Sequence, residues 1–179
     1  SHLFGGWRVS GIFTASSGVP VGPKLRGRNA PDLSRAANNQ RPELMPGRTV
    51  ENMTTGVTAG CLGLPGGQKL GTPDLYFDPC AFTVPPPGFY GNAGRNSIIG
   101  PGFFNVDFSL SKSIPIGISE ESRLQVHADL FNLANHPNFG RPEQETIVQS
   151  TGRVQPGAGE ITETVSSERQ IQFGLKFIF

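Results

Sequence analysis

The last eleven residues of the chain read Arg169-Gln170-Ile171-Gln172-Phe173-Gly174-Leu175-Lys176-Phe177-Ile178-Phe179. Large apolar side chains stand at every second position of this stretch, namely Ile171, Phe173, Leu175, Phe177 and Phe179. The alternate positions hold Gln170, Gln172, Gly174 and Lys176. A period of two over this length is typical of a β-strand with one apolar and one polar face. The sequence therefore predicts a two-faced strand from Arg169 to Phe179.

The length of this strand suits a membrane. A tilted strand of about 9–11 residues crosses a bilayer. The chain stops on Phe179 with no polar tail, whereas the termini of soluble domains tend to fray in water. The stretch resembles the terminal strand of a bacterial outer-membrane β-barrel, whose last residue is typically Phe. An edge or core strand of a soluble sandwich is the alternative.

Composition favours an all-β chain with long loops. The 179 residues include 24 Gly and 16 Pro, and helix formers are sparse. Fifteen basic and fourteen acidic residues give a net charge of +1 without a polybasic block, so nothing points to nucleic acid. No run of about 18 apolar residues exists, so no transmembrane helix is predicted. The chain starts without Met or a signal peptide, and we expect a fragment whose targeting segment lies upstream of Ser1.

Three earlier stretches show the same alternation as the terminal strand. They predict strands over Trp7 to Ser16, Phe104 to Lys112 and Arg123 to Leu133. The stretch from Ser17 to Pro101 is rich in Gly and Pro and is expected to be mostly irregular. A short helix is predicted within it, over Asp32 to Asn39, with Asp32 as its cap.

The connections between the predicted strands alternate in length. Ser17 to Pro101 is very long, Ser113 to Ser122 is short, and Ala134 to Glu168 is long. Outer-membrane barrels have short periplasmic turns and long extracellular loops. If Phe179 ends in the periplasm, the short connection is periplasmic and both long ones are extracellular. A soluble sandwich has no reason to alternate in this way.

Four motifs carry a resemblance to a known family, and they stand in the same order and spacing as in that family. The motifs are Tyr90-Gly91-Asn92-Ala93-Gly94-Arg95-Asn96, Gly100-Pro101-Gly102-Phe103-Phe104-Asn105-Val106-Asp107, Asp129-Leu130-Phe131-Asn132-Leu133-Ala134-Asn135-His136-Pro137-Asn138-Phe139-Gly140 and Arg169-Gln170-Ile171-Gln172-Phe173-Gly174-Leu175-Lys176-Phe177. Together they resemble the carboxy-terminal barrel of Oar-like TonB-dependent transporters. The resemblance covers most of the chain from Tyr76 onward and is weaker before it.

The resemblance implies a barrel of about 22 strands, an amino-terminal plug and energy from the inner-membrane TonB complex. Residues 1–179 are then the carboxy-terminal portion of the barrel, an antiparallel meander of about four long strands with two long loops. The plug, the TonB-contacting segment and the earlier strands would lie outside this chain. The resemblance also implies that barrel-assembly machinery reads an assembly signal in the terminal strand. That signal consists of Ile171, Phe173, Leu175, Phe177 and Phe179.

Cys61 and Cys80 are the only cysteines, and both lie in the first long connection. An even pair in an oxidising compartment predicts a disulfide. It would close a loop of about 20 residues and contribute about 3 kcal/mol in the chain-entropy model. Neither cysteine lies in a CxxC motif or beside a histidine at zinc spacing, so no metal site is predicted.

Asp107, His127 and Asp129 share the polar face of the predicted hairpin. A register centred near Gly117 would place Asp107 opposite His127, and one centred near Ile118 would place it opposite Asp129. Paired carboxylates with a histidine could perform acid–base chemistry. A hydrogen-bonded polar patch facing the barrel lumen is the preferred interpretation, because lumen faces are polar by construction.

The sequence therefore predicts a transport protein of the cell outer membrane rather than an enzyme, with no cofactor. Its function would be energy-dependent import of a scarce ligand. The expected partners are outer-membrane lipid, the barrel-assembly machinery, the TonB complex through the missing amino-terminal parts, and a small ligand of unknown identity. A passive porin or adhesion barrel shares the strand pattern but needs no plug. A soluble β-sandwich that binds carbohydrate is a third possibility.

Overall fold

The structure is a computed structural model that describes residues 4–27, 40–117, 121–148 and 150–179. The chain forms two compact units. The first combines Ser1–Ser16, Gly102–Asn138 and Thr164–Phe179, and the second combines Ser17–Pro101 with Phe139–Glu163. The short helix predicted over Asp32 to Asn39 lies outside the described residues.

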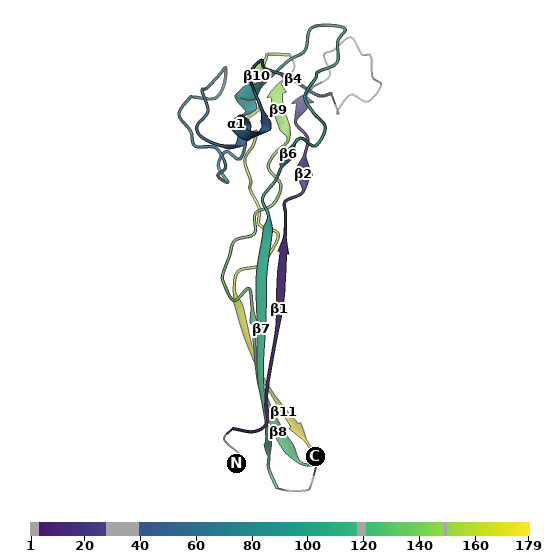
Figure 1. Cartoon of the computed structure of the whole chain (residues 1–179), viewed down its shortest axis with the longest axis vertical. Coiled ribbons are helices and arrows are strands. Elements are labelled where there is room, and N and C mark those ends of the chain that lie inside the picture. Colours follow the sequence, from purple (N-terminus) through teal and green to yellow (C-terminus); the bar gives the residue numbers. More distant parts are fainter. Residues whose placement is uncertain (1–3, 28–39, 118–120, 149) are drawn as a thin grey trace. The chain divides into compact units, whose positions relative to one another are not determined.

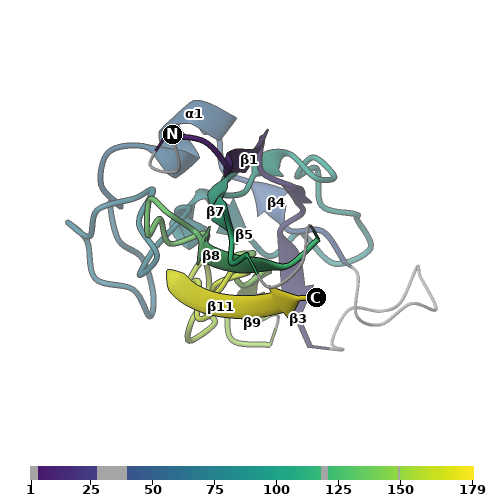
Figure 2. The same cartoon turned by 90° about the horizontal axis from the view of Figure 1, so that it is seen from below.

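The first unit is built on a four-stranded antiparallel sheet in the order β1-β7-β8-β11, shown in Figure 1 and from below in Figure 2. Its strands are β1 (Trp7–Ser16), β7 (Phe103–Pro115), β8 (Arg123–Phe131) and β11 (Gln170–Ile178). Spatial order follows chain order, so the sheet is a meander of long strands. This confirms the all-β fold class and the four strands that alternation predicted.

Two strand ends differ from the prediction by two or more residues. β8 ends at Phe131 instead of Leu133, because Asn132 adopts the left-handed conformation with φ 49° and turns the chain out of the sheet. β7 runs on to Pro115, which pairs with Arg123. A proline is tolerated at a strand end, where no further ladder hydrogen bond is needed from its nitrogen.

The hairpin register differs from both predicted registers. Asp129 pairs with Ser109, and His127 pairs with Ser111. Asp107 is therefore opposite neither His127 nor Asp129, and the predicted pairings were wrong. The strands are offset by two residues from the nearer prediction and by four from the other. Even offsets keep every side chain on its face, so alternation could not distinguish these registers.

The pairing gathers the apolar side chains of all four strands on one face of the sheet. The face extends along β1 and β7 and continues across β8 and β11 in matched rows. Two such rows are Val9, Leu110, Ala128, Phe173 and Gly11, Phe108, Leu130, Ile171. The opposite face carries the polar rows Arg8, Ser111, His127, Gly174 and Ser10, Ser109, Asp129, Gln172.

The apolar face is exposed within the chain. Phe173 is 77% exposed and Leu175 is 61% exposed. At one end of the face the Lys112 ammonium lies 4.5 Å from the centroid of the Trp7 ring, within reach of a cation–π contact. Monomeric soluble proteins rarely expose a large contiguous apolar patch, so this face is built to be covered by another apolar phase or partner.

The second unit is made from the first long connection, which was expected to be mostly irregular, and from most of the second. Its elements are short: β2 (Pro20–Val21), β3 (Lys24–Arg26), β4 (Glu43–Leu44), α1 (Val50–Thr54), η1 (Pro79–Ala81), β5 (Phe82–Thr83), β6 (Ile98–Ile99), β9 (Glu145–Val148) and β10 (Arg153–Val154). β3, from the first connection, pairs in parallel with β9 from the second. The two connections thus share one sheet and fold together.

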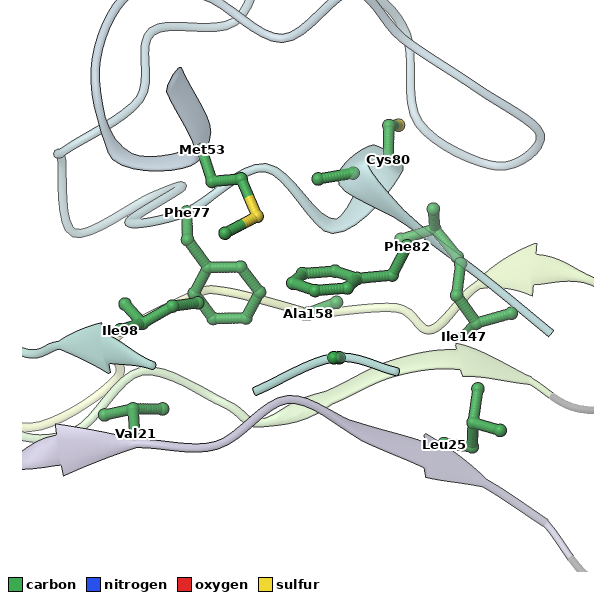
Figure 3. Packing of buried hydrophobic residues seen from close by; sticks show 12 residues of the cluster. Val21, Leu25, Met53, Phe77, Cys80, Phe82, Ile98, Ile147 and Ala158 are labelled. Atoms are coloured by element: carbon green, nitrogen blue, oxygen red, sulfur yellow. The ribbon is translucent and has the colours of Figure 1, made fainter. Parts of the chain in front are cut away.

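A hydrophobic core lies inside this second unit (Figure 3). The rings of Phe77 and Phe82 meet edge to face, with their centroids 6.3 Å apart. Val21, Leu25 and Ile147 are almost fully buried around them. Burial of each large side chain contributes about 1.5–3 kcal/mol, so this core can hold short elements that would be unstable alone.

Among the described residues, no helix is long and apolar enough to cross a membrane.

Candidate functional site

The candidate site is the first unit's sheet, with a polar patch at mid-strand and a cluster of asparagines at one end. In the patch, the Ser109 hydroxyl donates a 2.5 Å hydrogen bond to Asp129 Oδ1. Nε2 of His127 lies 3.9 Å from Asp129 Oδ2. The serine proton is therefore directed at a carboxylate and not at a histidine base. Ser109, His127 and Asp129 therefore form a polar patch that a hydrogen bond and a His–Asp contact hold together.

His127 packs over the backbone of its neighbour on β11. A Cβ atom placed on Gly174 would overlap the His127 ring. Gly174 pairs directly with His127, so the glycine leaves the space that the imidazole occupies. The only glycine of β11 therefore has a packing role, which its place in the alternation did not reveal.

Asp107, the third residue of the predicted patch, makes no hydrogen bond or ion pair with His127 or Asp129. Its Oδ1 accepts hydrogen bonds from Asn105 Nδ2, at 2.9 Å, and from the backbone N–H of Asn132, also at 2.9 Å. The second bond holds the residue that ends β8. Asp107 therefore fixes the end of the hairpin, while His127 and Asp129 lie further along it.

Asn132 is the first of three asparagines that tie the strand ends together. We call Asn132, Asn135 and Asn138 the asparagine clasp. The Asn132 side chain donates to the carbonyls of His136 and Ser167, at 3.1 Å and 3.0 Å, and accepts from the His136 N–H. It thus joins the segment after β8 to the segment before β11.

The other two members of the clasp bond further strands. Asn138 is fully buried. Its Oδ1 accepts from the Phe104 N–H at 2.7 Å and its Nδ2 donates to the Phe104 carbonyl at 3.0 Å, so the side chain bonds this backbone as a neighbouring strand would. Its amide also donates to Ser166 Oγ. Asn135 accepts from the Arg169 N–H at 3.0 Å. The clasp therefore secures β7, β8 and β11 at the same end of the sheet.

The clasp residues belong to the motif that runs from Asp129 to Gly140 in the sequence. Asn132 and Asn135 both have φ of 49°, a left-handed conformation that Asn adopts more readily than most residues. The family resemblance of this motif did not predict the hydrogen bonds that its asparagines form. Repeated asparagines directly after a strand were the available signal.

A family model for an outer membrane beta barrel domain matches residues 1–172. The chain belongs to this outer membrane beta barrel family. No curated protein and no solved structure matches it. The barrel domain resides in the cell outer membrane, as the alternation of the terminal strand predicted. Its long strands, among the described residues, form the four-stranded sheet β1-β7-β8-β11.

The terminal strand of the barrel domain carries the predicted assembly-signal residues on one face. Those in β11 are all exposed, and Phe179, which follows β11, is 93% exposed. The five side chains are therefore accessible within the described part of the chain. Their role as a signal stays a prediction.

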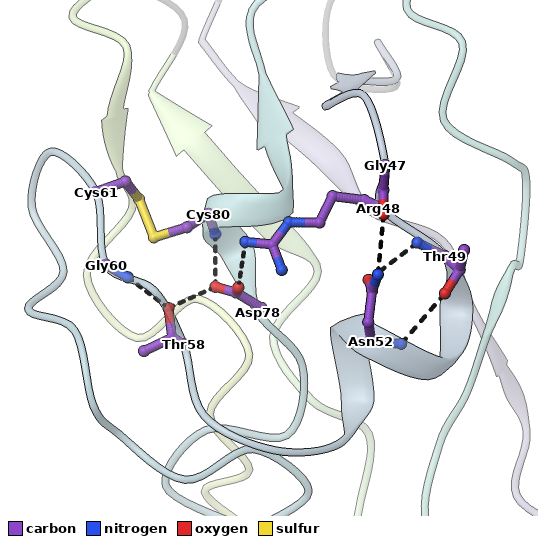
Figure 4. A network of polar contacts seen from close by, with 9 residues as sticks. All are labelled: Gly47, Arg48, Thr49, Asn52, Thr58, Gly60, Cys61, Asp78 and Cys80. Carbon is purple, nitrogen blue, oxygen red and sulfur yellow. Dashed lines mark hydrogen bonds and ion pairs between the residues drawn. A yellow bond between two sulfur atoms is a disulfide. The ribbon is translucent and has the colours of Figure 1, made fainter.

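In the second unit of the barrel domain, Cys61 and Cys80 form a disulfide. Beside it the Asp78 carboxylate is completely buried (Figure 4). Asp78 Oδ1 accepts from the Thr58 hydroxyl at 2.7 Å and from the Cys80 N–H at 3.0 Å. Asp78 Oδ2 lies 3.0 Å from Arg48 Nη2 and forms an ion pair with it, without a well-aligned hydrogen bond.

This network compensates for burial of a charge that would otherwise be costly. The even number of cysteines predicted the disulfide, but no sequence pattern marked Asp78 and Arg48 as the ion pair beside it. Nearby, Tyr76 donates a 2.9 Å hydrogen bond to the Ile99 carbonyl, and burial raises the pKa of the Tyr76 phenol. Among the described residues, no group of three or more His, Cys, Asp or Glu gathers that could hold a metal ion.

Proposed function

We propose that this barrel domain is the carboxy-terminal part of a TonB-dependent transporter that imports a scarce ligand. The observation that carries the proposal is the pattern of connections on a sheet of the outer-membrane family. The four Oar-like motifs also support the proposal. Two of them contain the asparagine clasp and the terminal strand. The plug and the TonB-contacting segment are expected outside this chain.

The register supports an orientation for the domain. The strand ends at Ser16, Phe103, Phe131 and Gln170 all lie at the same end of the sheet. Both long connections leave from this end, whereas the short connection joins β7 and β8 at the other. In outer-membrane barrels long loops are extracellular and short turns are periplasmic. The second unit then faces the outside, where its disulfide is stable.

The two faces of the sheet then have separate surroundings. The apolar face contacts outer-membrane lipid, and the polar patch of His127, Asp129 and their neighbours faces the lumen. Asp107 lies on the same polar face at the clasp end. The terminal strand, ending at Phe179, supplies the recognition signal for the assembly machinery. The lipid and lumen assignments follow from the polarity of each face, whereas the assembly-signal assignment follows from the resemblance to the Oar-like family.

Energy-coupled uptake separates this proposal from a passive barrel. The protein with its upstream regions is purified in detergent and placed in planar lipid bilayers. A plugged transporter should show no steady conductance, and cellular uptake that depends on the protein should stop when the TonB complex is deleted. A porin would conduct steadily and keep its uptake without TonB, and that result would refute transport coupled to TonB.

A further inference from the structure

A cationic pocket lies in the second unit, away from the disulfide and the Asp78 network. Its volume is about 290 Å³. Lys24, Arg41 and Arg95 line it, together with Gly22, Pro23, Gly94 and Asn96. None of the described residues that line it is acidic. Neither the disulfide nor the sheet of the first unit contributes to it.

The framework of the pocket is held by backbone bonds. The Lys24 N–H donates to the Gln144 carbonyl at 2.8 Å, and the Lys24 carbonyl accepts from the Thr146 hydroxyl at 3.0 Å. Lys24 therefore stands on a fixed segment where β3 meets β9. Arg41 Nη1 donates to the Ala93 carbonyl at 3.0 Å, which fixes the direction of that guanidinium.

Arg95, the third cation of the pocket, lies next to a close contact between Gly22 and Asn96. Asn96 has φ of 50° and thus turns the chain sharply next to Arg95. A Cβ atom placed on Gly22 would lie 3.2 Å from the Asn96 backbone nitrogen, tighter than most contacts. Glycine at position 22 thus lets the turn that carries Arg95 approach the segment that carries Lys24.

The charges of the pocket are not neutralised within the described part of the chain. No ion pair of Lys24, Arg41 or Arg95 with a carboxylate occurs there. The nearby Glu145 pairs instead with Arg26, at 3.6 Å. Three positive charges in one concavity repel one another and attract anions strongly, because a shaped cleft focuses the field.

We propose that this pocket binds a small soluble oxyanion that carries at least two negative charges, such as a phosphate or carboxylate compound. Guanidinium groups bind carboxylate and phosphate oxygens through paired hydrogen bonds, and a lysine adds a mobile point charge. The volume is slightly below the range of drug-sized ligand pockets, which favours a small compound. The site goes beyond transport, since it requires only the fold of the second unit.

Calorimetric titration of the purified protein with inorganic pyrophosphate tests the proposal. We expect a dissociation constant below about 1 mM at low ionic strength, and weaker binding as salt screens the charges. The variant with both Lys24→Gln and Arg95→Gln should bind at least about tenfold more weakly, since it removes two charged contacts. Neither side chain makes a hydrogen bond or ion pair in the described part of the chain, so folding should be preserved.

Matched controls remove the same charges elsewhere on the second unit. Lys69→Gln and Arg153→Gln replace exposed cations outside the pocket and should leave pyrophosphate affinity unchanged. No titratable heat with pyrophosphate, or equal loss in pocket and control variants, would overturn the proposal. Binding to phosphatidylglycerol vesicles without binding to pyrophosphate would also overturn it, in favour of a lipid-surface contact. These outcomes are independent of the conductance and uptake results that test transport.

Discussion

Replacing Leu175 with arginine tests which face of the sheet meets lipid. Leu175 lies next to the centre of β11, pairs with Val126 of β8 and is 61% exposed within the chain. If this face contacts lipid, the position is near the membrane midplane. An arginine there costs about 2–4 kcal/mol of folding free energy.

Gln172→Arg is the matched control, since it adds the same charge three residues away on the polar face. Gln172 pairs with Asp129 and is exposed within the chain. A cation beside this carboxylate on a polar face should change stability by no more than about 0.5 kcal/mol. The expected difference between the two variants is therefore at least about 1.5 kcal/mol.

The assay is urea unfolding of the protein folded into phospholipid vesicles, with outer-membrane levels in cells measured in parallel. If Leu175→Arg fails to assemble, Ile171→Arg keeps the test open, because Ile171 lies near the end of β11 and its cost should fall to about 0–1 kcal/mol. Equal destabilisation by Leu175→Arg and Gln172→Arg, or no dependence on depth, would refute the lipid-facing assignment.

Three further predictions concern the second unit, the clasp and the terminal residue. Arg48→Ala strands the buried Asp78 carboxylate and should destabilise the second unit by about 3–5 kcal/mol, measured as lost amide-exchange protection around Asp78. Asn138→Ala leaves the Phe104 N–H and carbonyl without their partners and should cost about 2–3 kcal/mol in vesicle-based urea unfolding; unchanged stability would contradict the clasp. Deleting Phe179 removes a side chain that is 93% exposed, so stability should hardly change. The variant should nevertheless accumulate in the periplasm, and normal outer-membrane levels on cell fractionation would exclude a signal role.

The long strands could be predicted from sequence because the sheet has two unlike faces. Such a sheet imposes period two on its residues, and Phe173 beside Gln172 shows that period plainly. The place of Asp107 could not be predicted, because a shift of two residues changes every partner and leaves every face intact. In the observed register β7 extends to Pro115, which pairs with Arg123 at the start of β8.

The second unit was not visible in the sequence for a different reason. Its strands have two to four residues, which is too short for any period to emerge. Its core combines residues from distant segments, such as Leu25 and Ile147, that only the folded chain brings together. The disulfide between Cys61 and Cys80 could be predicted because a chain with two cysteines offers a single pairing. The cationic pocket was missed because Lys24 and Arg95 are far apart in the chain.

The parallel pairing of β3 with β9 constrains how this protein can vary or be engineered. Loops of a barrel are usually regarded as separate inserts, each replaceable while the others remain. Here the first connection supplies Leu25 and the second supplies Ile147, and both are buried in one core. In a chimera that exchanges one connection alone, the core residues of the new connection would pack against a second connection whose side chains do not match them. The two connections should therefore be inherited, transplanted or redesigned as a pair.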